Sequence, residues 1–254
     1  MSQPPIVGQP CALTAYDWDV FDDAQLILAD LDGCLISGAT VLSGVPDLFA
    51  RYGHKLAVVS NNSEDIGETL SRRLASLGLK LPADQAFLAG EQAVRQLALE
   101  RPASSVLVYG SATLRDFAMR CGLVLCGAHE QPATVLLARD TTFCFADLAD
   151  LMALVTANIP VWVTNPDPSH PRADGVPVPE TGSLWAAVTA ATGTTPQRIV
   201  GKPQPLLLTR ALEQFDVAAK HAVMIGDTAA TDGAAAAAAR VRFFHVDQRE
   251  HTTR

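Results

Sequence analysis

Short apolar segments alternate with amphipathic or alanine-rich segments along most of this chain of 254 residues. The apolar segments have the length of strands, and the segments between them have the length and periodicity of helices. Regular alternation of the two indicates a mostly parallel sheet covered by helices, so the sequence predicts an α/β fold. The predicted strands are 26–29, 56–60, 106–109, 135–138, 161–164, 223–225 and 241–246, and the predicted helices are 66–77, 91–99, 146–157, 184–192 and 205–215.

The composition restricts the class of partner. Hydrophobic residues make up 48% of the chain and charged residues 18%, which is enough apolar material for one large domain or two modest ones. The formal net charge is −8 and the pI is about 5.1, so we expect no nucleic acid and no acidic membrane surface as the main partner. A small anionic ligand fits this chain if local cations or a metal ion bind it.

The five cysteines are odd in number and lack the spacing of a zinc site. This usage is typical of a reducing compartment rather than of a disulfide framework. The first twenty residues show no signal-peptide pattern, and no segment has the length and hydropathy of a membrane span. We therefore expect a cytoplasmic protein.

Two carboxylates follow the first predicted strand directly. Asp30 and Asp32 come after the apolar residues 26–29, and Gly33 follows them. Parallel α/β sheets bind their ligands beyond the carboxyl ends of their strands, so this is a place for chemistry. Taken alone, the pair is more simply explained as turn residues, because Asp and Gly are common in turns.

Further polar residues stand at comparable places in the predicted sheet. Ser60 and Asn61 end one strand, Asp227 follows another, and Asp232 comes shortly afterwards. Lys202 lies in a Gly-Lys-Pro turn before a predicted helix. Each has an ordinary structural explanation by itself, such as a helix cap or an exposed lysine.

The four acids together indicate a metal site more strongly than any one of them does alone. If Asp30, Asp32, Asp227 and Asp232 met at one sheet edge, each pair would repel by roughly 4 kcal/mol at about 4 Å and an effective dielectric near 20. A divalent cation and an ammonium group would relieve this repulsion. Oxygen ligands without histidine or cysteine favour Mg²⁺ over zinc, and Lys202 could supply the ammonium.

These segments resemble the four ordered motifs of the haloacid dehalogenase superfamily. The matching segments are Asp30–Cys34, Ser60–Ser63, Gly201–Pro203 and Gly226–Asp232. Within that superfamily, Thr164–Asp167 and Pro179–Leu184 resemble the NagD-like branch of para-nitrophenyl phosphatases and pyridoxal phosphate phosphatases. The order of the motifs extends the similarity from about Tyr16 to Val246.

The resemblance implies a domain organisation. A Rossmann-like core would be formed by residues 1–102 and 197–254, with an inserted α/β cap of type II at 103–196. The proline-rich segment 164–182 is predicted to be a long, stiffened loop of that cap. Its residues Asn165, Asp167 and His170 are candidates for reading the leaving group of the substrate.

The resemblance also implies roles for the aspartates. Asp30 would be the nucleophile that forms an aspartyl-phosphate, and Asp32 would be the general acid and base. Mg²⁺ would be held by the carboxylates of Asp30 and Asp227 and by the carbonyl of Asp32. Asp232 would contact these ligands rather than the metal itself, or would orient Lys202.

The same resemblance assigns the phosphate-binding groups and the reaction. Ser60 and Lys202 would bind the phosphoryl oxygens, with Asn61 in support. The expected function is a Mg²⁺-dependent phosphatase of a small phosphorylated metabolite, with a homodimer as the expected assembly. A sugar-phosphate mutase or a dehalogenase on the same core, and a non-catalytic protein that binds a phosphorylated ligand, are the alternatives.

Overall fold

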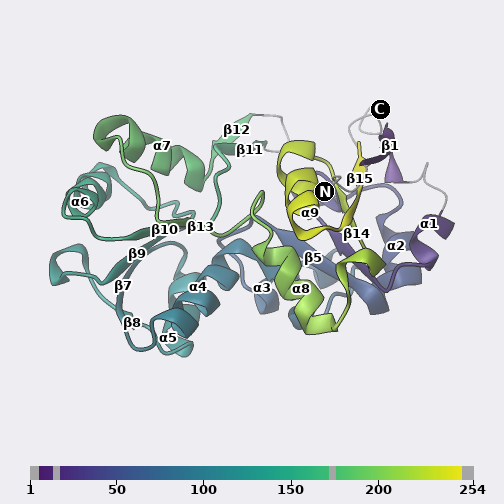
Figure 1. Cartoon of the computed structure of the whole chain (residues 1–254), viewed down its shortest axis with the longest axis horizontal. Helices are drawn as coiled ribbons and strands as arrows, with labels where there is room; N and C mark the ends of the chain where they lie inside the picture. The colour runs from purple at the N-terminus through teal and green to yellow at the C-terminus, as the bar shows by residue number, and fades with distance from the viewer. Residues whose placement is uncertain (1–5, 14–17, 172–175, 248–254) are drawn as a thin grey trace. The chain divides into compact units, whose positions relative to one another are not determined.

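The structure is a computed structural model that describes residues 6–13, 18–171 and 176–247 (Figure 1). The chain forms two compact units. The first contains residues 1–60, 67–87 and 202–254, and the second contains residues 61–66 and 88–201. Each unit is built around a parallel sheet of its own.

The first unit contains a six-stranded sheet in the order β1-β15-β14-β2-β5-β6. Its strands are β1 (Ile6–Cys11), β2 (Leu26–Ala29), β5 (Leu56–Ser60), β6 (Ala86–Leu88), β14 (Ala222–Gly226) and β15 (Arg242–Val246). In this spatial order, each pair of neighbouring strands from β1 through β15, β14 and β2 to β5 is parallel. Strands β2, β5 and β14 are buried along their whole length, which explains their continuous apolar sequences.

The first unit contains five α-helices among its described residues. They are α1 (Asp19–Asp22), α2 (Val45–Tyr52), α3 (Gly67–Ser76), α8 (Leu206–Phe215) and α9 (Ala234–Ala239). Helix α8 lies against β2 and β5 and buries Leu207, Leu208 and Ala211. Helix α9 consists of six alanines and packs on α8 and β15. After β2, a short hairpin is formed by β3 (Ile36–Ser37) and β4 (Thr40–Val41).

The second unit contains a five-stranded sheet in the order β13-β10-β9-β7-β8, in which all four pairs are parallel. Its strands are β7 (Ser105–Tyr109), β8 (Val124–Leu125), β9 (Thr134–Leu137), β10 (Val161–Val163) and β13 (Arg198–Ile199). Its helices are α4 (Ala89–Glu100), α5 (Ala112–Arg120), α6 (Phe145–Thr156) and α7 (Thr181–Thr192). Helices α6 and α7 pack together over a core that includes Leu137, Leu151 and Trp185.

The predicted α/β fold with parallel sheets is confirmed. The segment 103–196, which we expected to form a cap, lies wholly within the second unit. That unit also includes residues 61–66, 88–102 and 197–201. Among the described residues, no helix combines the length and the apolar character needed to cross a bilayer.

The prediction of a loop throughout 164–182 is wrong in part. The segment contains an antiparallel pair, β11 (Ser169–Pro171) and β12 (Pro177–Pro179), and α7 already begins at Thr181. Pro171 and Pro177 lie opposite each other in this two-stranded ribbon. Proline is tolerated there because an edge strand needs few backbone donors, so a high proline content did not exclude a strand.

Candidate metal and phosphate site

Three predicted site residues lie at the carboxyl edge of the first sheet. Strand β2 pairs in parallel with both β14 and β5, so the carboxyl ends of these strands meet. Asp30 follows β2, Asp227 follows β14, and Ser60 is the last residue of β5. The Asp30 amide still donates to the Ile225 carbonyl at 2.9 Å, so the sheet fixes the backbone of Asp30.

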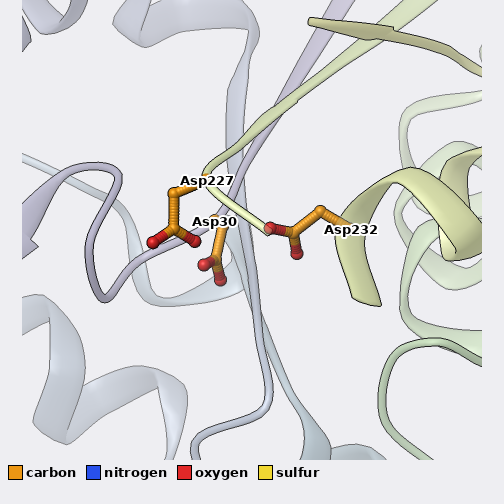
Figure 2. A group of neighbouring side chains, drawn as sticks. All are labelled: Asp30, Asp227 and Asp232. Carbon is orange, nitrogen blue, oxygen red and sulfur yellow. The ribbon is translucent and has the colours of Figure 1, made fainter. Parts of the chain in front are cut away.

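Three aspartates form one carboxylate cluster (Figure 2). Asp30, Asp227 and Asp232 each offer an oxygen, and these oxygens lie within 4.8 Å of one another. Asp232 belongs to a π-helical turn, Ala229–Gly233, and its carboxylate accepts from the Thr228 amide at 3.1 Å. Asp30 is 8% exposed and Asp232 only 1%, so the cluster is largely shielded from water.

Lys202 brings one ammonium group into the carboxylate cluster. Its Nζ lies 2.5 Å from Oδ1 of Asp30 and 2.7 Å from Oδ1 of Asp232. It also donates to the Val59 carbonyl at 3.0 Å, and the residue is 2% exposed. One buried cation therefore contacts two of the three carboxylates in the cluster.

The pKa values of the cluster are shifted by burial and by the neighbouring charges. Burial, and then the charge of Asp232, raise the pKa of Asp30 well above its usual value, although Lys202 acts in the opposite direction. Burial and Asp232 also raise the pKa of Asp227. Burial alone would lower the pKa of Lys202, but Asp232 and Asp30 raise it, so the ammonium stays charged. The cluster consists of oxygen donors with excess negative charge, and this donor set fits Mg²⁺.

The loop after Asp30 passes close to Asp227. Gly33 has a φ of +85°, and a Cβ atom at this position would lie 2.3 Å from Oδ2 of Asp227. The neighbouring Cys34 is fully buried, and burial followed by the charge of Asp30 raises the pKa of its thiol well above the usual value. The thiol is therefore held in its unreactive protonated form.

Asp32 is placed differently from the other predicted acids. It is exposed, and its backbone forms an isolated bridge with Ile36. Its carboxylate is not part of the carboxylate cluster. We expected four acids at this edge, and the structure brings three of them together. Asp32, two residues after Asp30, is in contact with solvent instead.

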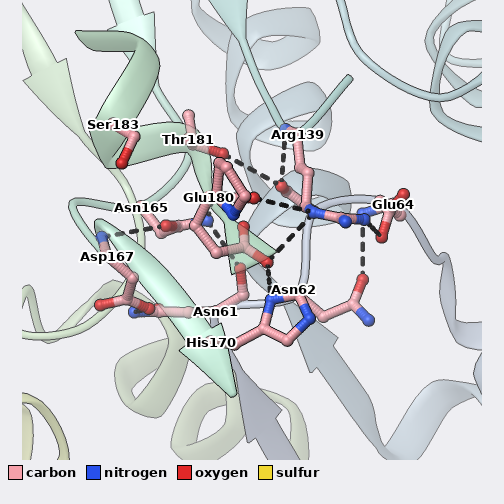
Figure 3. A network of polar contacts seen from close by, with 12 residues as sticks. Asn61, Asn62, Glu64, Arg139, Asn165, Asp167, His170, Glu180, Thr181 and Ser183 are labelled. Atoms are coloured by element: carbon pink, nitrogen blue, oxygen red, sulfur yellow. Dashed lines mark hydrogen bonds and ion pairs between the residues drawn. The ribbon is translucent and has the colours of Figure 1, made fainter. Parts of the chain in front are cut away.

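The second unit brings together three more of the predicted residues (Figure 3). The Asn61 side chain donates to Oδ2 of Asp167 at 2.8 Å, and Asn165 donates to the Asn61 carbonyl at 2.9 Å. The Asp167 amide donates to the Asn165 side chain at 3.1 Å. Asn61, which follows Ser60 in the sequence, is thus hydrogen-bonded to the segment that we predicted to contact the leaving group of the substrate.

His170, the remaining predicted residue, lies on β11 and contacts residues that the sequence analysis missed. Its Nδ1 lies 2.6 Å from Oε1 of Glu180, and the same oxygen lies 3.3 Å from Nε of Arg139. Arg139 also forms an ion pair with Glu64. Arg139 lies beyond the carboxyl end of β9, so the strand-end rule that indicated Asp30 could have indicated it as well.

Comparison with known proteins places the chain in a family. The sequence model of the haloacid dehalogenase-like hydrolases matches residues 27–124, and a second, HAD-hydrolase-like model matches residues 199–253. Chronophin of Mus musculus is 37% identical over 227 residues, covering 84% of this chain and 77% of chronophin. The protein belongs to the haloacid dehalogenase-like hydrolases and is therefore an enzyme of the hydrolase class.

Solved structures agree with this family. A putative NagD protein superimposes with a TM-score of 0.84 at 27% identity, covering 92% of each chain. A glycerol phosphate phosphatase from Mycobacterium tuberculosis, solved in complex with magnesium, has a TM-score of 0.82 at 27% identity, covering 89% of this chain and 68% of that one. The resemblance to the NagD-like branch is confirmed.

Proposed function

We propose that the protein is a Mg²⁺-dependent phosphatase that hydrolyses a small phosphomonoester through an aspartyl-phosphate intermediate. The observation that carries this proposal is the carboxylate cluster of Asp30, Asp227 and Asp232 at the carboxyl edge of a parallel sheet, two of whose members contact the ammonium of Lys202. The similarity to a glycerol phosphate phosphatase in complex with magnesium supports it.

Two aspartates perform the covalent steps in this proposal. A carboxylate oxygen of Asp30 attacks phosphorus, and the bond from phosphorus to the ester oxygen breaks. Asp32 gives its proton to the departing oxygen. It then takes a proton from a water molecule that attacks the aspartyl-phosphate, which releases inorganic phosphate and restores Asp30. The exposed position of Asp32 is compatible with this exchange of protons with substrate and water.

The remaining groups bind the phosphoryl group and the metal. The carboxylates of Asp30 and Asp227 and the carbonyl of Asp32 would hold Mg²⁺, which neutralises charge on the phosphate when bound. Lys202 and Ser60 bind the phosphoryl oxygens, with Asn61 in support. Asp232 orients Lys202, and their 2.7 Å contact supports this role. Such positioning and charge neutralisation are most of what phosphoryl transfer requires.

The second unit has the role of a type II cap in this proposal, with residues 103–196 as the inserted segment. Asn165, Asp167 and His170 read the leaving group of a small phosphorylated metabolite. Support comes from the hydrogen bonds that join Asn165 and Asp167 to Asn61, the neighbour of Ser60 in sequence.

Assembly and location complete the proposal. The expected assembly is a homodimer, and light scattering on the purified protein would measure its mass directly. The expected location is the cytoplasm. Cys34, Cys121, Cys126 and Cys144 are free thiols, as is typical of a reducing compartment.

The test is an assay of phosphate release from a panel of phosphomonoesters. With Mg²⁺ we expect inorganic phosphate from para-nitrophenyl phosphate and from polyol or sugar phosphates, and none in the presence of a chelator. An isomerised sugar phosphate without free phosphate would indicate the mutase instead. Binding of the esters without any turnover would indicate a non-catalytic binding protein.

A further inference from the structure

The polar network around His170 contains two charged residues to which the proposed reaction assigns no role. Glu180 and Arg139 lie in the second unit, with side chains 15% and 17% exposed. Ion pairs run without interruption from Glu64 through Arg139 to Glu180, which in turn contacts His170 (Figure 3). The four groups thus form a chain that ends on an imidazole.

The contact between His170 and Glu180 decides where the imidazole proton resides. The distance from Nδ1 to Oε1 is 2.6 Å, which is a short, charge-assisted hydrogen bond. An ionised carboxylate can only accept, so Nδ1 must carry the proton. The neutral ring then presents Nε2 as an acceptor.

This conclusion requires that Glu180 be ionised, and Arg139 favours that form. Burial raises the pKa of Glu180 above its usual value, and the contacts with His170 and Arg139 oppose this rise. The guanidinium of Arg139 is itself held by Glu64, and its backbone amide donates to Oγ of Ser63 at 3.0 Å. A cation fixed in this way stabilises the carboxylate form of Glu180 over its neutral form.

The backbone around Glu180 is fixed as well. The Glu180 amide donates to the Pro168 carbonyl at 3.0 Å, and the Gly182 amide donates to the Asp167 carbonyl at 2.9 Å. A Cβ atom at Gly182 would lie 2.1 Å from the Pro166 carbonyl oxygen, so only glycine allows this close approach. The carboxylate of Glu180 is therefore held in a defined position beside β11.

The other end of the His170 ring is accessible. The side chain is 40% exposed, and in the part of the chain that the structure describes Nε2 forms no hydrogen bond. An acceptor in this position binds a hydroxyl or N–H donor and disfavours another acceptor.

We propose that Glu180 and Arg139 are positioning residues that hold the proton of His170 on Nδ1, so that Nε2 accepts a hydrogen bond from a hydroxyl group of the leaving alcohol. The part that concerns substrate rests on the proposed phosphatase function. The part that concerns the proton depends only on the second unit and can be measured without turnover.

The proton position is tested by NMR on protein labelled with ¹⁵N in histidine. Long-range ¹H–¹⁵N correlations distinguish a protonated Nδ1 from a protonated Nε2, and a His170→Gln variant assigns the signals. We expect the Nδ1–H form in the wild type at neutral pH. In Glu180→Ala we expect the ring to revert to the Nε2–H form that free imidazole side chains favour in water.

Arg139 is tested with a matched pair of variants. Arg139→Met removes the cation and should increase the Nε2–H population, whereas Arg139→Lys keeps a positive charge and should remain near the wild type. A merely structural role would lower the melting temperature without changing the tautomer. The proton assignment is overturned if wild-type His170 carries its proton on Nε2, or if Glu180→Ala leaves the tautomer unchanged.

The consequence for substrate is tested by comparing two esters. Glu180→Ala should lower kcat/KM for glycerol phosphate by roughly 5- to 10-fold, the usual value of one hydrogen bond, and leave para-nitrophenyl phosphate nearly unaffected because its alcohol has no second hydroxyl. An equal loss for both esters would overturn the hydroxyl assignment. Absence of all phosphatase activity would refute the proposed function instead, and the NMR result would still stand by itself.

Discussion

At the carboxyl edge of the first sheet three carboxylates cluster and two of them contact one ammonium, whereas at the carboxyl edge of the second sheet the signs of the charges alternate from Glu64 to Arg139 to Glu180. Both edges collect polar side chains because parallel strands end there. At the second edge each of these three charged groups contacts a group of opposite charge. At the first edge Lys202 contacts Asp30 and Asp232 while Asp227 adds a third carboxylate, and such an excess of negative charge is typical of a site completed by a ligand.

The size of this charge excess is the reason why we propose the first edge as the reactive one. Two carboxylates at about 4 Å repel by roughly 4 kcal/mol at an effective dielectric near 20. Burial, and then the charge of Asp232, raise the pKa values of Asp30 and Asp227. A bound cation converts the repulsion into attraction, so metal binding and activity should both depend on these groups.

The largest expected effect is the loss of the proposed nucleophile. Asp30→Asn keeps the shape of the side chain but removes the attacking oxygen, so turnover should fall by about 10⁴-fold or more. Steady-state release of inorganic phosphate measures this. Wild-type turnover in Asp30→Asn would show that no aspartyl-phosphate forms at this residue.

A smaller loss of turnover is expected when Asp32, the proposed general acid and base, is replaced. Asp32→Asn should lower turnover on the order of 10² to 10⁴, the usual contribution of a positioned proton donor. The defect should shrink with para-nitrophenyl phosphate, because its leaving group needs little protonation. If the variant is equally defective with good and poor leaving groups, Asp32 is not the acid of the first step.

The raised pKa values predict how magnesium affinity depends on pH. A carboxyl with a raised pKa keeps its proton to higher pH, and Mg²⁺ must displace that proton. The affinity should therefore weaken as the pH falls through the range between the usual aspartate pKa and the raised values, by up to about tenfold per pH unit for each proton displaced. Calorimetric titrations in buffers of different ionisation enthalpy would detect the released protons. The carboxylate cluster is wrongly described if the affinity is independent of pH.

Mutations at the carboxyl edge of the second sheet should have mild effects on activity and stability. Asp167→Ala removes the acceptor for the Asn61 side chain, which should raise KM by roughly 5-fold and lower the free energy of unfolding by about 1 kcal/mol. Asp167→Asn keeps an acceptor oxygen at the same place and serves as the control. Kinetics and urea denaturation measure the two quantities, and a loss as large as that of Asp32→Asn would contradict the contrast between the edges.

The sequence indicated the residues that depend on local rules. Asp30, Ser60 and Asp227 were found because each stands at the end of an apolar strand, and β2 and β5 have the predicted bounds. The separation of Asp32 from the carboxylate cluster was not predicted, because it depends on the path of the loop after the strand.

Contacts between distant segments were missed for a related reason. The links from Glu64 to Arg139 and from Arg139 to Glu180 join segments far apart in sequence, and no local pattern reveals them. Strand β1 was missed as well, since Ile6–Cys11 has no alternating or continuous apolar pattern, although it pairs in parallel with β15 at the other end of the chain. Tertiary pairing rather than local propensity determines such elements.

Magnesium binding to wild-type protein and to Asp227→Asn, measured by calorimetry with a thermal-denaturation control, tests the central claim most directly. Asp227 belongs to the carboxylate cluster, whereas the Lys202 contacts go to Asp30 and Asp232, so the variant should keep its fold. We expect one Mg²⁺ per wild-type chain with a raised melting temperature, and neither effect in Asp227→Asn. Equal binding by both proteins, or no binding by the wild type, would contradict the account.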